Sequence, residues 1–171
     1  MKETMKENQK IGIFESVALF SGILSLCMMA LPAYWETGKD SITLLQMVFG
    51  NDRLDFNSFL LLGMILLIIG SAVAAIVAVI CFTKKSYSEK TITILGIVSG
   101  IFFLASAIIL ALGIIITGLD KENSELGLIQ GNWGIGIGNI LVPLFGFISF
   151  VMSYPASLII LNHKDLKDKK K

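Results

Sequence analysis

The chain has 171 residues and a net charge of +1, and 54% of its residues are hydrophobic whereas only 16% are charged. Soluble domains carry about 25% charged residues, so a soluble protein of this length could not bury so much apolar surface in one core. The composition therefore excludes an ordinary soluble domain and predicts an integral membrane protein.

Four apolar stretches are each long enough to cross a bilayer, which takes about 20 helical residues for a hydrocarbon core of about 30 Å. They are Ile11–Leu31, Ser58–Phe82, Thr91–Leu119 and Gly134–Leu161. Helices are expected because an isolated strand in lipid would leave its backbone polar groups unpaired. The sequence thus predicts an all-α membrane protein, a four-transmembrane-helix bundle that forms a single integral membrane domain over residues 1–171.

The distribution of basic residues predicts the orientation of these helices, because cytoplasmic segments are enriched in Lys and Arg. Eleven basic residues fall in the two tails and the second connection: Lys2, Lys6, Lys10, Lys84, Lys85, Lys90, Lys164, Lys167, Lys169, Lys170 and Lys171. Only Lys39, Arg53 and Lys121 fall in the other two connections. We therefore expect both termini in the cytoplasm, outer loops at 32–57 and 120–133, and a multi-pass protein of the plasma membrane. The preference for Lys over Arg hints at a bacterial source.

The first outer loop contains one apolar segment, Ile42–Phe49, which suits either an amphipathic helix or a strand because its periodicity does not separate the two. Asp55 or Asn57 is expected to cap the second span. Both outer loops have two readings: they are plain connections, or they form a docking surface for a partner.

Small residues recur within the predicted spans, where they allow helix backbones to approach closely. The candidate packing positions are Gly70, Ala74, Gly96, Gly100, Gly134 and Gly138. Such rows favour either packing inside the bundle or a lipid-facing surface that docks a second copy or another membrane protein.

The fourth stretch has the least regular sequence. It opens with three glycines, and Pro143 follows Asn139 by four residues, so it cannot donate a hydrogen bond to the Asn139 carbonyl. A broken helix is expected here, and broken helices are tolerated at membrane depth where they line a cavity or are buried in protein. Asn139 and Pro143 are therefore candidate functional residues, although proline kinks also occur in purely structural spans.

Glu15 is the only acidic residue inside a predicted span. Acidic residues within membranes are costly and often functional, and they usually face the bundle interior or a partner. Glu15 lies four residues past Ile11, so we expect it near the inner headgroup boundary. The candidate partners are backbone donors and the side chains at the inner helix ends: Lys84, Lys85, Lys90, Tyr154 and His163. A structural and a functional role both stay open.

The chain carries no recognisable catalytic or metal-binding motif. His163 is the single histidine, and neither a Ser/His/acid set nor a phosphate-binding loop is present. Cys27 and Cys81 are predicted to lie at opposite leaflets and to be free thiols. We therefore expect no enzymatic activity, no cofactor, no metal and no nucleic-acid partner.

Two local features are similar to known families. Leu31-Pro32 followed by Trp35 at the start of a long outer loop resembles claudin-type tetraspans, but their cysteine pair is missing from this loop. An acid early in the first of four helices resembles small multidrug exporters, whose chains are much shorter. Neither resemblance covers enough of the chain to imply a function.

The predicted function is that of a small non-enzymatic membrane protein which binds a partner in or at the bilayer, as an accessory subunit, an assembly factor or an immunity-type protein. The partner is expected to be another membrane protein or a second copy. The alternative is a small transporter or channel that uses Glu15 and the broken fourth helix.

Overall fold

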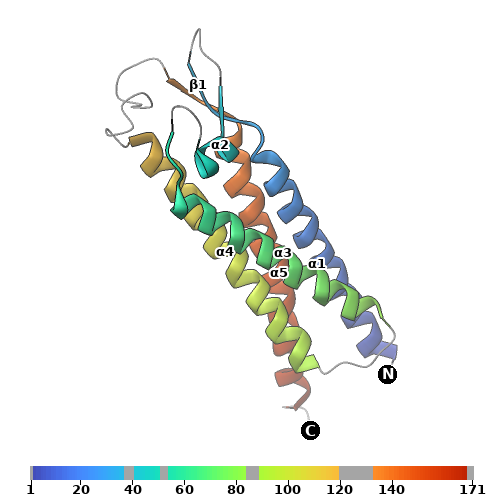
Figure 1. The fold of residues 1–171 in the computed structure, drawn as a ribbon. Coiled ribbons are helices and arrows are strands. Elements are labelled where there is room, and N and C mark those ends of the chain that lie inside the picture. Colours follow the sequence, from blue (N-terminus) through green and yellow to red (C-terminus); the bar gives the residue numbers. More distant parts are fainter. Residues whose placement is uncertain (1, 37–40, 51–53, 84–88, 120–132, 169–171) are drawn as a thin grey trace.

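The computed structural model describes residues 2–36, 41–50, 54–83, 89–119 and 133–168, and the side chains of 9–34, 41–50, 54–83, 90–116 and 135–154. Figure 1 shows the fold. The elements in chain order are α1 (Lys2–Met28), β1 (Pro32–Glu36), β2 (Ile42–Thr43), α2 (Leu44–Phe49), α3 (Ser58–Phe82), α4 (Glu89–Leu119), β3 (Trp133–Ile135) and α5 (Gly138–Asp168).

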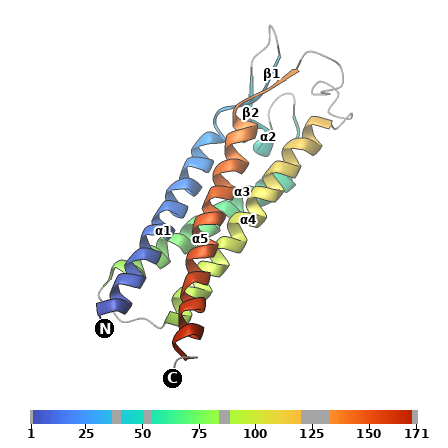
Figure 2. The same cartoon turned by 180° about the vertical axis from the view of Figure 1, so that it is seen from behind.

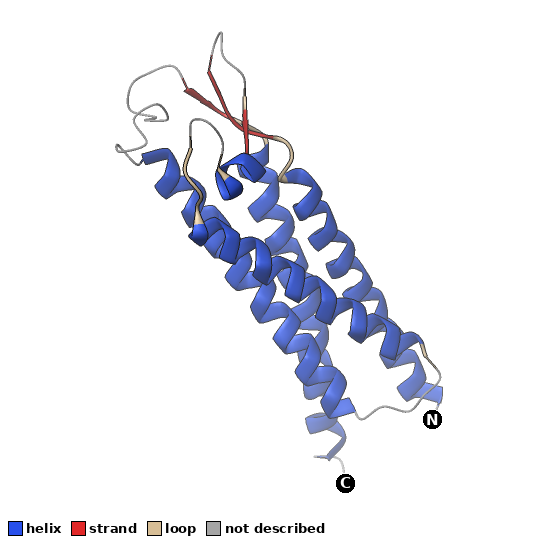
Figure 3. Ribbon diagram, viewed as in Figure 1, coloured by secondary structure: helices blue, strands red, loops and turns tan. Residues whose placement is uncertain are grey.

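The four long helices lie side by side, and each packs against two others. Helix α1 contacts α3 and α5, and α4 contacts the same two helices from the other side. The views from the front and from behind agree on this arrangement (Figures 1 and 2). The strands gather at one end of the helices, which we call the sheet end (Figure 3). The first residues of α1 and the last residues of α5 lie at the opposite end, which we call the terminal end (Figure 1).

Three of these helices are long and apolar enough to cross a membrane: Gln9–Met28 of α1, Ser58–Phe82 and Lys90–Ile116 of α4. They coincide with the first three predicted spans. The apolar part of α5 with described side chains, Gly138–Tyr154, is shorter. This supports the membrane assignment by length and composition.

Small residues pack these helices against one another. A Cβ built at Gly70 would lie 3.2 Å from the Phe103 ring, and one built at Gly100 would lie 3.1 Å from the Cβ of Tyr154. Ala74 and Gly96 are also buried. These contacts favour packing inside the molecule over a lipid-facing docking row at these four positions.

The described structure is mostly helical, in line with the predicted class, and it also contains one small β-sheet. The two predicted outer loops contribute to one three-stranded antiparallel sheet in the order β2-β1-β3. Tyr34 pairs with both Ile42 and Ile135. The pairing of Tyr34 with Ile135 joins segments that are about 100 residues apart in the chain, so the local sequence pattern did not reveal it.

The predicted start of the fourth span is also wrong. Gly134 lies in β3, where it pairs with Trp35 of β1, and it is therefore part of the sheet and not of a helix. Helix α5 begins only at Gly138. At Gly138 a Cβ would lie 2.9 Å from the carbonyl oxygen of Leu31. Gly138 therefore packs the start of α5 against the turn after α1.

The segment that suited either a helix or a strand contains both. Ile42 and Thr43 form β2, and Leu44–Phe49 forms α2. Thr43 caps α2, because its side chain accepts a hydrogen bond from the Gln46 amide and the Gln46 side chain accepts one from the Thr43 amide. Of the two predicted candidates, Asp55 and Asn57, the cap of α3 is Asn57, and its side chain accepts from the amides of Phe59 and Leu60.

We call the sheet and α2 together the sheet cap. Hydrogen bonds and apolar contacts attach the sheet cap to the helices. The Tyr34 hydroxyl donates to the carbonyl of Ile114 in α4 over 2.9 Å. The Leu45 amide donates to the Met29 carbonyl, and the Gly136 amide donates to the Ala33 carbonyl over 2.7 Å. The apolar residues beneath the cap belong to the same buried core as the helices: Met29, Ala33, Ile42, Leu44, Met47, Val48 and Leu54.

Candidate functional site

Glu15 faces the interior between helices and has no exposed surface. Its two carboxyl oxygens lie 2.9 and 3.1 Å from the hydroxyl oxygen of Ser153 in α5. The same hydroxyl lies 3.0 Å from the carbonyl oxygen of Gly96 in α4. Glu15, Ser153 and Gly96 therefore join three helices at one point, and we call them the Glu15 cluster.

Small residues allow this close approach. Gly100, one turn beyond Gly96, lets the Tyr154 backbone approach α4, because a Cβ at Gly100 would lie 3.1 Å from the Tyr154 Cβ. On the other flank, a Cβ at Gly12 would lie 2.9 Å from the Cβ of Cys81 in α3. The helices are thus drawn together on both sides of Glu15.

Among the described side chains, the partner of Glu15 is Ser153, which is not one of those that the sequence suggested. Lys90 is exposed, and the side chains of Lys84, Lys85 and His163 lie outside the described residues. Tyr154 is adjacent to the observed partner, Ser153. The missed signal was a serine within an apolar span, because its hydroxyl must find an acceptor where water is absent.

Other buried serines make the same kind of contact between helices. Ser25 of α1 donates to the Val142 carbonyl of α5 over 2.8 Å. Ser99 and Ser106 of α4 donate to carbonyls of α3, at Gly70 and Gly63. The structure thus gives these three serines a hydrogen-bonding role between helices.

Pro143 does not break the fourth helix, which corrects the prediction of a broken span. Helix α5 is a single element from Gly138 to Asp168 and passes through both Pro143 and Pro155. A proline removes one backbone hydrogen bond from a helix. Contacts with α1 and α4 support α5, including the bond from Ser25 to the carbonyl just before Pro143.

Asn139 lies in the first turn of α5, close to Tyr34. Burial raises the pKa of the Tyr34 hydroxyl from its ordinary value of 10.0, and the neighbouring Asn139 side chain offsets part of that rise. Both amide atoms of Asn139 are buried, and neither has a hydrogen-bond partner of good geometry among the described residues. Asn139 therefore contributes a polar group just beneath the sheet cap.

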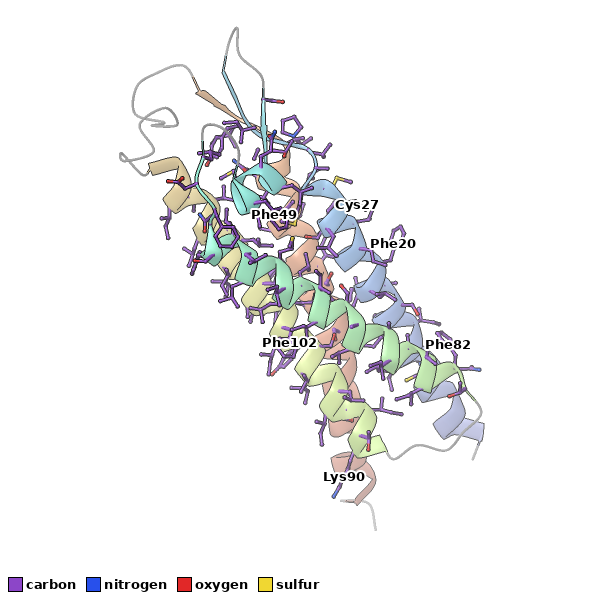
Figure 4. The ribbon with its side chains drawn as sticks, viewed as in Figure 1. Phe20, Cys27, Phe49, Phe82, Lys90 and Phe102 are labelled. Atoms are coloured by element: carbon purple, nitrogen blue, oxygen red, sulfur yellow. The ribbon has the colours of Figure 1, made fainter. Side chains whose placement is uncertain are left out.

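The two cysteines are free thiols, as predicted. Cys27 is exposed near the sheet end, whereas Cys81 is buried next to Phe82 at the terminal end (Figure 4).

Comparisons with known protein families, with curated proteins and with solved structures find no match for this chain.

Proposed function

We propose that this chain is a non-enzymatic, multi-pass protein of the cell membrane that binds a membrane-protein partner through its sheet cap. In this proposal all four long helices cross the bilayer, both termini are cytoplasmic and the cap lies outside. The eleven basic residues in the tails and the second connection support this orientation.

The observation that carries the proposal is the folded and exposed state of the cap. A plain connection would not need three strands, a capped helix and a hydrogen bond from Tyr34 to α4. The cap and the connection from it to α3 also expose large apolar side chains, with 57% of Phe49 and 57% of Phe56 accessible. The Asn57 amide donates to the Val48 carbonyl, which joins the backbone next to Phe56 to the backbone next to Phe49.

Exposed aromatic side chains on a rigid support are typical of binding surfaces, because ordering them costs little on association. Gly63 and Gly70 of α3 and Ser99 and Ser106 of α4 face inward and are occupied by contacts within the chain. This leaves the cap as the best supported contact surface.

Site-specific photo-crosslinking in intact cells tests the proposal. A photoreactive phenylalanine analogue at position 49 or 56 is expected to give a discrete protein adduct. The same analogue at Ile76, which is 52% exposed in the middle of α3, is expected to react with lipid. Mixing two differently tagged copies then distinguishes a second copy from a different protein.

Serine substitutions provide the matched functional control. Phe49→Ser and Phe56→Ser are expected to abolish the adduct formed from the other position while the protein keeps its thermal unfolding temperature. Equal protein crosslinking at positions 49 and 76, or adducts that survive both substitutions, would overturn the proposal.

The buried position of Glu15 favours one alternative, a small transporter. A carboxyl group that joins three helices could bind a proton or a cation during transport. A flux assay in liposomes distinguishes the two functions, since only a transporter shows a flux that Glu15→Gln abolishes.

A further inference from the structure

The Glu15 cluster has more acceptor oxygens than its hydroxyl group can serve. The Ser153 oxygen lies 2.9 and 3.1 Å from the carboxyl oxygens of Glu15 and 3.0 Å from the carbonyl oxygen of Gly96. The separations of 2.9 and 3.0 Å lie within the usual range for O–H···O hydrogen bonds, and the third is slightly longer. A serine hydroxyl carries one hydrogen, whereas a carbonyl and an ionised carboxylate carry none to donate.

One added proton supplies the donor hydrogen that the cluster lacks. If Glu15 is a neutral carboxylic acid, its O–H donates to the Ser153 oxygen, and the Ser153 O–H donates to the Gly96 carbonyl. If Glu15 is ionised, the Ser153 hydrogen turns to the carboxylate. The Ser153 and Gly96 oxygens then face each other at 3.0 Å without a hydrogen between them.

A metal ion fits the cluster less well than a proton. Calcium takes about six to eight oxygen ligands and magnesium about six in octahedral geometry. The cluster supplies only the two carboxyl oxygens, one hydroxyl and one carbonyl. The described residues bring together no group of three His, Cys, Asp or Glu side chains that could hold a metal.

Among the described residues, the groups around Glu15 offer an ionised carboxylate little compensation. Cys81 of α3 interacts electrostatically with Glu15 and is buried. Tyr154 of α5 is next to Ser153, and its ring stacks on Phe150. The described lysines on the neighbouring segments, Lys10 of α1 and Lys90 of α4, are exposed. A neutral acid avoids the cost of burying an unpaired charge.

We propose that Glu15, Ser153 and the Gly96 carbonyl form a proton-binding site that couples one protonation event to the packing of α1, α4 and α5. Loss of the proton breaks the Glu15 O–H bond, leaves its electron pair on the carboxylate and releases the proton to water. The three helices then lose one hydrogen bond and gain a buried charge, so their packing is weakened. This inference does not depend on the proposed partner.

Infrared spectroscopy of the full-length protein in lipid nanodiscs tests the site directly. At neutral pH we expect a carboxylic-acid C=O band that is lost in Glu15→Gln. Ser153→Ala is expected to shift this band, because the acid loses its acceptor. Ser149→Ala is the matched control, since Ser149 is equally buried but bonds to Phe145 within its own helix, and it should leave the band unchanged.

Thermal unfolding gives a second readout. The wild-type protein should lose stability as the pH rises through the range in which the band disappears, whereas the neutral Glu15→Gln protein should lack this loss. If the wild type has no acid band that responds to Glu15→Gln or Ser153→Ala at neutral pH, the proposal is overturned. Loss of the band on adding sodium at constant pH would also overturn it, because the site would then bind a metal ion.

Discussion

At the scale of single residues, glycines and serines determine how closely the helices approach. Gly22 of α1 is the tightest example with described neighbours in two helices. A Cβ built there would lie 2.5 Å from the Ser71 hydroxyl oxygen and 2.9 Å from the Phe103 ring. This contact places α1 directly against α3 and against a buried side chain of α4.

Gly22→Ala should therefore destabilise the protein by about 1–3 kcal/mol, the usual cost of overpacking a well-filled core. Gly146→Ala is the control, because its Cβ would meet the Ala107 Cβ at 3.3 Å and needs a smaller adjustment. Unfolding in a mild detergent measures both. Equal stability of the Gly22→Ala and wild-type proteins would contradict this packing.

Tyr34 supplies a pH-dependent contact between the sheet cap and α4. Burial raises its pKa above the ordinary value of 10.0, so the folded protein holds this proton more tightly than the unfolded chain. The resulting stability is present below about pH 10 and is lost as the pH rises from there towards the folded-state pKa.

Tyr34→Phe should remove this dependence, and it should also cost about 0.5–1.5 kcal/mol at neutral pH through loss of the bond to Ile114. Unfolding of both proteins between neutral and strongly alkaline pH tests the prediction. The stability difference between them should shrink above about pH 10. A stability difference that stays constant with pH would show that folding does not raise the pKa of Tyr34.

At the scale of elements, side-chain caps explain where α2 and α3 begin. Asn57 and Thr43 each accept a hydrogen bond from an amide of the first turn that has no partner within the helix. These caps lie where the chain passes from the sheet cap into α3 and from β2 into α2. They therefore fix the entry points of two helices.

Asn57→Ala should lower stability by about 1 kcal/mol, because two amides at the start of α3 lose their acceptor. Ser58→Ala is a suitable control, since Ser58 is exposed and lies within the same turn. Hydrogen exchange at the amides of Phe59 and Leu60 should become faster only in Asn57→Ala. Unchanged exchange in both variants would argue against this cap.

At the scale of the whole molecule, the sheet cap and the chain ends lie at opposite ends of the helices (Figure 1). This separation makes the predicted orientation testable at described positions. In a background with Cys27 and Cys81 replaced, a cysteine at Ser41 in the sheet cap should react with an impermeant thiol reagent added to intact cells. A cysteine at Thr83, beyond α3, should react only after permeabilisation. Both positions are exposed in the structure. Labelling of Thr83→Cys from outside would reverse or reject the predicted topology.

The sequence alone determined the first three long helices and reduced the cap of α3 to two candidates. Ser58–Phe82 was predicted with the bounds that the structure has, because apolar length and an Asn cap are local properties of the chain. The inward orientation of Glu15 also followed from the cost of placing a carboxylate in lipid.

Only the tertiary structure decided which groups meet. The partner of Glu15, Ser153, is 138 residues away in the chain. Trp35 pairs with Gly134, although α3 and α4 lie between them in the sequence. Neither contact leaves a periodic signal in either segment, because each depends on how the helices approach one another. The continuity of α5 through Pro143 has the same origin, since packing against α1 and α4 supports a helix in which proline removes a local hydrogen bond.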